Sequence, residues 1–335
     1  MAKPSLPKQM RKVADKALLS RIESGLELVE AALQKATEHT DPIAKVTARH
    51  LVDAGGKRIR PVLVLLTSQL GDYNNSAVID AAVVVELTHL ATLYHDDVMD
   101  DAPTRRGVPT AHNIWGNSVA ILTGDLLFAR ASQIVSRLGE KALTLQADTF
   151  ERLCLGQLHE TVGPQPDEDA VDHYIRVLAD KTGSLIAASA QLGAMFADAP
   201  DEYLEPLTSY GEKVGVAFQL IDDVIDIAEA GASGKTPGTD LRAGVPTLPM
   251  LLLRAQARTD SAAAELVEFI DAGLEDDAKL AEAVKRLREH EVAEQAYQQA
   301  KRWADEAVAA LAALPDSNVK SALKNFAEAV VDRDN

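Results

Sequence analysis

Residues 76–107 read SAVIDAAVVVELTHLATLYHDDVMDDAPTRRG. Apolar residues recur at helical spacing along most of this stretch, and no alternating β-branched pattern interrupts them. Four aspartates then fall within six residues, Asp96 to Asp101, before Pro103 ends the helix. Because carboxylates one helical turn apart repel each other, this helix end is unstable unless cations neutralise it. The stretch therefore predicts a core helix that carries a cation site at its C-terminal end.

A second stretch, QLIDDVIDIAEA from Gln219, repeats the arrangement. At about 100° per residue, carboxylates at i and i+4 stack on one helix face and the carboxylate at i+1 lies beside them. Two such trios facing each other would form an all-oxygen cage for hard cations, Mg²⁺ before Zn²⁺ because neither contains cysteine. A single such motif in an acidic chain is more often a solvated helix end, but two copies favour the metal site. The predicted metal ligands are Asp96, Asp97, Asp100, Asp222, Asp223 and Asp226.

The rest of the 335-residue chain shows the same helical spacing at residues 22–38, 117–138 and 263–274. Hydrophobic residues make up 47% of the chain and aromatics only 4%, which is typical of packed helices. We expect an all-α fold of about ten or more helices. Since the two trios must meet to share a ligand, we expect one domain over residues 1–335, with 1–20 as a loosely attached N-terminal segment.

The formal charge of −17 argues against nucleic acid or an anionic membrane as a general partner, because both require a basic surface. The single cysteine, Cys154, cannot form an intrachain disulfide. The N-terminus lacks the apolar core of a signal peptide, and we expect no later run near the roughly 18 apolar residues of a membrane span. These features predict a soluble, cytoplasmic protein with no integral membrane segment.

Basic residues follow both trios. Arg105 and Arg106 come after the first trio in one loop, and Lys235 comes after the second in a glycine-rich loop. Arginine offers a planar fork to phosphate oxygens and lysine a point charge. A third basic point, GGKRIRP at 55–61, precedes a predicted proline-started helix whose N-terminus favours anions, although an ordinary charged turn is the alternative there. Two carboxylate trios with several separate cationic loops indicate two diphosphates bound at once. The third basic point contains Lys57, Arg58 and Arg60.

With these motifs the chain resembles the trans-prenyltransferases, the polyprenyl diphosphate synthase family. The resemblance implies the isoprenoid synthase fold, an all-helical bundle around a deep central cavity, usually in a homodimer. It also implies a transferase that adds isopentenyl diphosphate head-to-tail to an allylic diphosphate with Mg²⁺. The motifs occur in the family's order and span most of the chain: GGKRIRP, ELTHLATLYHDDVMDDAPTRRG, GDLLFARA, KTGSLIAASAQLGA, FQLIDDVIDI and GKTPGTDLRAGVPTLP.

Carried over position by position, the resemblance makes the two trios the ligands of three Mg²⁺ ions, which Mn²⁺ can replace, and adds Lys181 and Lys235 to the catalytic residues. Taken alone, His89 would more often be a helix histidine and Lys181–Thr182 a polar break in a helix. The positions that match allylic diphosphate contacts are Arg105, Lys181, Thr182, Gln219 and Lys235. The positions that match isopentenyl diphosphate contacts are Lys57, Arg60, His89 and Arg106.

Product length depends on the helix before the first trio. Residues eight, five and four positions before Asp96 are Thr88, Ala91 and Thr92, all of them small. Family members with short products tend to carry bulky aromatics at the last two of these positions. One turn rises about 5.4 Å, comparable to an extended isoprene unit, so small side chains let the tail descend along the helix. We expect a medium- or long-chain all-trans polyprenyl diphosphate that supplies a quinone side chain, with geranylgeranyl diphosphate as the alternative. Close helix packing is the other explanation for small residues here.

Two other functions are compatible with this fold. A terpene cyclase would ionise the same kind of substrate, but its second motif typically carries Asn and Ser or Thr, whereas DDVID is complete here. A catalytically silent partner subunit tends to lose aspartates from these motifs, and this chain keeps all six. A structural scaffold would not need two matching trios. We therefore expect an active homodimer that binds both diphosphates and contacts the membrane only transiently for product release.

Overall fold

The computed structural model describes residues 15–228 and 237–331. Within these ranges nearly every element is a helix, and the strands are limited to one antiparallel pair, β1 (Thr104–Arg105) and β2 (Val108–Pro109). The all-α prediction is confirmed. The chain divides into two compact units, so the single domain over 1–335 stays a prediction. Unit 1 runs to Glu151 and includes Leu185–Gly211 and Ala310–Phe326; unit 2 comprises Arg152–Ser184, Glu212–Ala309 and the chain from Ala327.

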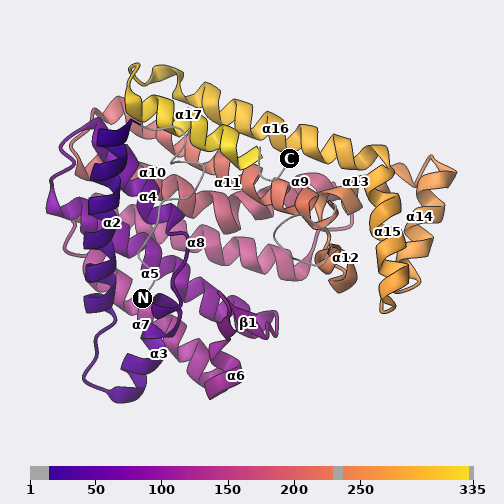
Figure 1. Ribbon diagram of the computed structural model, residues 1–335, viewed down its shortest axis with the longest axis horizontal. Coiled ribbons are helices and arrows are strands. Elements are labelled where there is room, and N and C mark those ends of the chain that lie inside the picture. The colour runs from indigo at the N-terminus through magenta and orange to yellow at the C-terminus, as the bar shows by residue number, and fades with distance from the viewer. Residues whose placement is uncertain (1–14, 229–236, 332–335) are drawn as a thin grey trace. The chain divides into compact units, whose positions relative to one another are not determined.

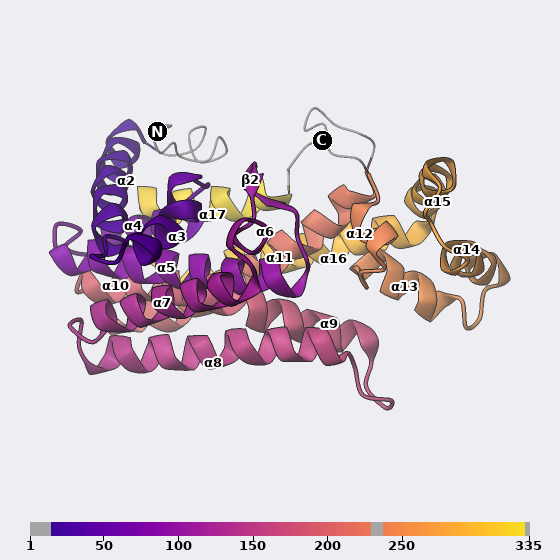
Figure 2. The ribbon, with the colours of Figure 1, turned by 90° about the horizontal axis from the view of Figure 1, so that it is seen from below.

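Unit 1 contains the first trio and the basic loop at 55–61. Its helix α5 packs against α2, α4 and α7 (Figures 1 and 2). We expected residues 1–20 to be loosely attached, but α2 begins at Lys16, and Leu18 and Ile22 on it are fully buried. The helices that lie wholly in this unit are α2 (Lys16–Ala36), α3 (Pro42–Asp53), α4 (Ile59–Thr67), α5 (Ser76–Met99), α6 (Ala111–Trp115) and α7 (Asn117–Val135).

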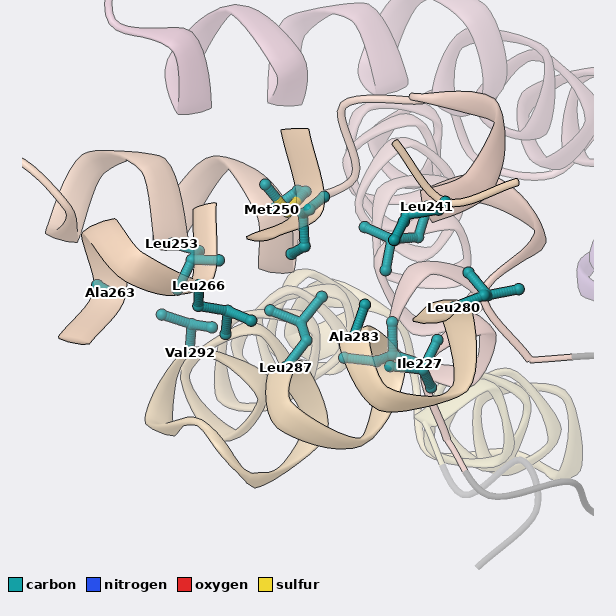
Figure 3. Close-up of a cluster of buried hydrophobic side chains, with 13 residues drawn as sticks. Ile227, Leu241, Met250, Leu253, Ala263, Leu266, Leu280, Ala283, Leu287 and Val292 are labelled. Carbon is teal, nitrogen blue, oxygen red and sulfur yellow. The ribbon is translucent and has the colours of Figure 1, made fainter. Parts of the chain in front are cut away.

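Unit 2 contains the second trio and its own apolar core. Figure 3 shows this core, in which Leu253, Leu266 and Leu287 come from three different helices and pack together. The elements in this unit are α9 (Ala170–Leu178), a π-helical turn (Ala179–Gly183), α12 (Thr239–Ala243), α13 (Leu248–Gln256), α14 (Ser261–Asp271), α15 (Asp277–Glu289) and α16 (Glu291–Ala310). The boundary between units falls at or within α8 (Glu140–Val162), α10 (Ser184–Phe196), α11 (Leu204–Asp226), the end of α16, and α17 (Asn318–Val331). Three short 3₁₀ turns complete the described elements: Ser68–Leu70, Asp201–Tyr203 and Leu311–Ala313.

Helix α5 is apolar around most of its circumference and is accordingly buried. Asn75 caps its N-terminus by accepting a hydrogen bond from the backbone N–H of Ala77 at 3.0 Å. At the other end, the N–H of Asp100 bonds the carbonyl of Asp96 at 2.8 Å, and the helix stops there. The helix thus ends where Pro103 and the aspartates predicted.

The basic loop corrects one prediction about α4. We expected a proline to start this helix, but α4 begins at Ile59 and Pro61 is its third residue. Arg58 precedes the helix in the left-handed conformation, with φ of 47°. Arg60 therefore lies in the first helical turn, and only Lys57 and Arg58 belong to the loop.

The short hairpin β1–β2 separates two arginines that we had placed in one loop. Arg105 is a strand residue paired with Val108, whereas Arg106 and Gly107 form the two-residue turn with φ of 54° and 79°. Positive φ at both positions is typical of the type I′ turns that close hairpins. Neighbouring strand and turn positions point side chains in different directions, so the two arginines can serve different ligands.

Two helices correct the expectation that no run resembles a membrane span. By length and composition alone, α5 and α7 are apolar enough to cross a membrane. Core helices of globular proteins pass the same test, and 61% of the relevant window of α5 is buried inside the protein. This is weak support for a membrane segment.

Candidate functional site

The first trio lies at the C-terminal end of α5. Asp97 is 1% exposed, and its Oδ1 accepts a hydrogen bond from Nε of Arg105 at 2.7 Å. Its Oδ2 is buried and has no hydrogen-bond partner among the described residues. Burial raises the pKa of Asp97, although Arg105 opposes the shift. Because the carbonyl end of a helix is itself negative, Asp96, Asp97 and Asp100 form a strongly cation-attracting end.

A cationic cluster in unit 1, formed by Arg60, His89 and Arg106, brings together three of the four residues predicted to bind isopentenyl diphosphate. Burial, then the positive charges of Arg60 and Arg106, lower the pKa of His89 well below its usual value, so its imidazole is neutral at pH 7. Burial also lowers the pKa of Arg60 to about 10, against the influence of Glu86. Nε of Arg60 is buried and finds no hydrogen-bond partner in the described part of the chain. Positive charge with an unused donor is what an anionic ligand would satisfy.

Arg58 differs from its basic neighbours because it is buried and fully engaged. It forms an ion pair with Glu30, donates from Nη1 to Oε1 of Glu86 at 2.7 Å, and donates to two backbone carbonyls. Glu86 is 1% exposed, and Nη2 of Arg106 lies 3.6 Å from the same carboxylate oxygen. Arg58 therefore holds the loop, while Lys57 is exposed to solvent.

Two glycines, Gly55 and Gly56, lie in contact with Arg106 of this cluster. Arg106 donates from Nη1 to the carbonyls of Leu51, at 3.0 Å, and Gly55. A Cβ added at Gly56 would lie 2.8 Å from Cζ of Arg106, and φ there is 147°. Glycine at position 56 therefore lets the Arg106 guanidinium lie directly against the loop backbone.

The second trio lies at the end of α11 in unit 2. Oδ2 of Asp223 accepts hydrogen bonds from the Tyr174 hydroxyl at 2.8 Å and from the Leu248 backbone N–H at 3.0 Å. Burial raises the pKa of Asp223 to about 7. Asp226 accepts from the backbone N–H groups of Thr239 and Asp240, at 3.1 and 3.2 Å, and from the Thr239 hydroxyl. Asp222 is exposed.

Lys181 and Thr182 lie in the π-helical turn between α9 and α10, where both are half-buried. Nζ of Lys181 forms an ion pair with Glu160 of α8. A π turn contains one extra residue and is frequent at functional sites. Gln219 is half-buried on α11, one turn before the second trio. Lys235 lies outside the described residues.

The three residues predicted to control product length differ in burial. Thr92 is half-buried, whereas Ala91 and Thr88 are fully buried within unit 1. Nε2 of Gln146 on α8 donates to the Thr88 hydroxyl at 2.8 Å, and the buried Oε1 of Gln146 has no partner among residues 15–228 and 237–331. Ala91 and Thr88 thus pack closely here, as the packing explanation requires, while Thr92 stays accessible.

The donors of both trios fit a hard divalent cation, since all are carboxylate oxygens and Oδ2 of Asp97 is left without a protein partner. Among the described residues, however, no three His, Cys, Asp or Glu side chains converge as they would around a bound ion. Asp97, Asp223 and Asp226 instead each accept a hydrogen bond from a protein donor. The metal role of the trios, and their meeting at one ligand, stay predictions.

The sequence matches the family model described as polyprenyl synthetase over residues 41–287. The chain belongs to the polyprenyl synthetase family. It is 42% identical to the nonaprenyl diphosphate synthase of Mycobacterium tuberculosis, with 96% of each chain covered. It resembles the crystal structure of geranylgeranyl pyrophosphate synthase from Corynebacterium glutamicum with calcium and isoprenyl diphosphate, at 43% identity and TM-score 0.85, covering 96% of this chain and 98% of that one. It also resembles a decaprenyl diphosphate synthase from Rhodobacter capsulatus, at 33% identity and TM-score 0.84, covering 95% and 99%.

The family and the isoprenoid synthase fold are thus as the sequence predicted. The sequence did not predict the roles of three residues in this polyprenyl synthetase. Tyr174 bonds Asp223 of the second trio, Glu86 lies beside Arg106 of the cationic cluster, and Arg152 bonds Asp180 in the π turn. Glu86 left a signal, because a lone charge inside the apolar run VVVELTHL must be buried with a partner. Tyr174 and Arg152 left none, since their partners lie 49 and 28 residues away.

Proposed function

We propose that this polyprenyl synthetase makes a medium- or long-chain all-trans polyprenyl diphosphate by adding isopentenyl diphosphate to an allylic diphosphate. The observation that carries the proposal is the cationic cluster of Arg60, His89 and Arg106, with the unused Nε of Arg60. A terpene cyclase binds one diphosphate and would not need a second, metal-independent anion pocket. The relatives named nonaprenyl and decaprenyl diphosphate synthase support the longer product.

In this proposal the isopentenyl diphosphate is bound by Lys57, Arg60, His89 and Arg106. Neutral His89 can donate one hydrogen bond to a phosphate oxygen without adding charge, while the arginines supply forked donors. Arg105 already bonds Asp97 at 2.7 Å and would reach the allylic diphosphate from the first trio. Separate cationic groups for the two substrates keep the isopentenyl double bond close to the allylic carbon.

The reaction breaks the allylic C–O bond, and the electron pair leaves with the diphosphate. Arg105, Lys181, Thr182, Gln219 and Lys235 would stabilise the growing charge on that leaving group, because preorganised donors act most strongly where charge develops. The isopentenyl double bond then attacks the allylic carbon to form a new C–C bond. Loss of a proton to the released diphosphate, the nearest base, completes the step. Apolar side chains on α5 exclude water, which would otherwise quench the cation.

Mg²⁺, held by Asp96, Asp97, Asp100, Asp222, Asp223 and Asp226, would neutralise the diphosphate charge when bound. We propose three ions per site and substitution by Mn²⁺. Calcium accompanies isoprenyl diphosphate in the C. glutamicum structure, which is consistent with a hard-cation site in the family.

We further propose that the enzyme is a cytoplasmic homodimer. Unit 1 exposes several large apolar side chains on α7 and on the part of α8 before Arg152, which a second copy would cover: Ile121, Leu122, Leu143 and Phe150. A hetero-oligomer is the second candidate, because a relative 36% identical is named heptaprenyl diphosphate synthase component 2. Light scattering of the purified chain separates these two possibilities.

The activity test is direct. Purified chain with Mg²⁺ and isopentenyl diphosphate is offered dimethylallyl, geranyl, farnesyl or geranylgeranyl diphosphate, and products are identified by mass. A ladder ending well above four isoprene units supports the proposal. A product that stops at geranylgeranyl diphosphate supports the alternative function, geranylgeranyl diphosphate synthesis, which the name of the C. glutamicum relative favours. Cyclic hydrocarbons, or no consumption of isopentenyl diphosphate by a chain that light scattering shows to be a homodimer, would rule out both.

A further inference from the structure

Arg152 ties three segments of unit 2 together at the π turn. Its Nε donates to Oδ1 of Asp180 at 2.7 Å, and its Nη1 donates to Oε2 of Glu212 on α11 at 2.7 Å. Its Nη2 also reaches the carbonyl of Ala179 at 3.4 Å. Arg152 itself is on α8, and its side chain is 38% exposed. One guanidinium therefore connects α8, the π turn and α11.

The backbones of these segments approach each other through glycines. A Cβ at Gly156 of α8 would lie 2.6 Å from the backbone nitrogen of Lys181. A Cβ at Gly215 of α11 would lie 2.6 Å from Cα of Gly183. The π turn is thus pressed between α8 and α11 where no side chain intervenes. Arg152 is the side chain that bonds both the turn and α11.

A π turn is less stable than an α-helix of the same residues, so it persists only where its surroundings favour it. If the π turn changed to a regular α-helix, Lys181 and Thr182 would rotate by about 100° around the helix axis. Asp180 directly precedes this pair, and its carboxylate is fixed by Arg152. The bond from Arg152 therefore selects the π register against the α register.

We propose that Arg152 is a positioning residue: its ionic bonds to Asp180 and Glu212 hold the π turn that presents Lys181 and Thr182 to the allylic diphosphate. The inference rests on the proposed function, which assigns those two residues to that substrate. Arg152 makes no contact with the reacting atoms in this role. Its effect is therefore on the binding of one substrate and on the local order of residues 179–183.

The test compares full-length Arg152→Met with Arg254→Met. Arg254 is a matched control, because it forms a two-bond ion pair with Asp271 in the same unit at similar exposure and does not touch the π turn. Hydrogen–deuterium exchange reports the turn without any substrate. We expect faster exchange of the amides of 179–184 in Arg152→Met alone. Equal exchange in wild type and Arg152→Met would overturn the proposal.

Steady-state kinetics give the second readout. We expect the KM for the allylic primer to rise roughly tenfold in Arg152→Met, while the KM for isopentenyl diphosphate changes less than about twofold. Arg152→Lys should recover only part of the loss, since an ammonium lacks the fork that reaches both carboxylates. If both KM values rise together, or if Arg254→Met behaves identically, Arg152 is merely structural. A wild-type homodimer that consumes no isopentenyl diphosphate would instead refute the proposed function, and the exchange experiment alone would then decide whether Arg152 holds the π turn.

Discussion

The hydroxyl of Tyr174 donates a hydrogen bond to Oδ2 of Asp223 at 2.8 Å. The Leu248 backbone N–H donates to the same oxygen at 3.0 Å, and burial raises the pKa of this carboxyl from 3.8 to about 7. Two donors on one oxygen fix the orientation of the carboxylate before any cation arrives. Burial nevertheless makes its negative charge costly in the metal-free protein.

This shift predicts a pH-dependent effect of Asp223→Asn on stability in EDTA. Between pH 4 and pH 7 the folded state keeps a proton that the unfolded state releases, so wild-type stability falls as pH rises through that range. Asparagine is neutral throughout, so the variant gains relative to wild type, by a few kcal/mol at pH 8, since one pKa unit corresponds to about 1.4 kcal/mol. Urea unfolding at pH 5 and pH 8 measures this gain, and the same gain at both values would contradict the prediction.

The carboxylate trios predict loss of activity without loss of fold. Asp96→Ala and Asp222→Ala should each lower turnover by about 100-fold or more in Mg²⁺, because the charge of the leaving diphosphate is no longer balanced. Their stability should change by less than about 1 kcal/mol, since removing one carboxylate relieves repulsion within the trio. Turnover and thermal unfolding are measured on the same preparations. Near-normal turnover in either variant would show that its trio is not part of the site.

The basic motif at 55–61 predicts two different roles for its three basic residues. Lys57→Ala and Arg60→Ala should raise the KM for isopentenyl diphosphate roughly tenfold, with little change in the KM for the allylic primer. Arg58→Ala should instead lower the free energy of unfolding by about 3–5 kcal/mol, because it leaves buried Glu86 without a main partner. Kinetics and urea unfolding of the three variants separate these roles. A folded, stable Arg58→Ala variant would contradict the structural assignment.

Product length is tested most cleanly at Thr92. Thr92 is half-buried, so Thr92→Phe should shorten the product while consumption of the first isopentenyl unit continues. Ala91→Phe should also shorten it, but Ala91 is fully buried, and overpacking there would cost about 1–3 kcal/mol of stability. Mass analysis of the products gives the length in both variants. An unchanged distribution in both would mean that the tail does not follow this face of α5.

Gln146→Ala extends the same test in the other direction. It removes the buried side chain that bonds Thr88, which lies one helical turn before Thr92 on α5. We expect a longer mean product, and Gln146→Leu, which keeps the volume, serves as the matched control. If the leucine variant lengthens the product as much as the alanine variant, the volume of the side chain at position 146 does not limit the length of the tail.

The sequence predicted those features that depend on local spacing. The end of α5 at Met99 before Pro103, the end of α11 at Asp226 and the carboxylate spacing all follow from helix periodicity and the proline. Side-chain partnerships far apart in the chain could not be predicted in this way. The position of Arg58 in the basic loop resembles that of Lys57, and its contacts with Glu30 and Glu86, each 28 residues away, make it structural.

The π turn and the hairpin illustrate a second limit. Lys181 and Thr182 are a polar break in the otherwise helical pattern of residues 170–196, but nothing in the sequence marks the extra residue at 179–183. Arg105 and Arg106 are the same residue type, yet the hairpin turn gives them different partners. Arg105 bonds Asp97, and Arg106 bonds the carbonyls of Leu51 and Gly55. Backbone conformation, rather than residue type, assigns these roles.

At Arg106 the left-handed backbone lowers stability, while the side chain serves the proposed function. The first position of this turn favours asparagine or glycine, and an arginine there strains the chain. Arg58, before α4, and Asp101, after the first trio, share the same conformation with φ of 47° and 48°. Selection for thermal resistance alone would therefore drive positions 101 and 106 toward glycine or asparagine, whereas the buried ion pairs of Arg58 keep arginine at position 58. A library screened only for thermal stability would therefore select such substitutions. At position 106 the substitution would remove the guanidinium group from the cationic cluster.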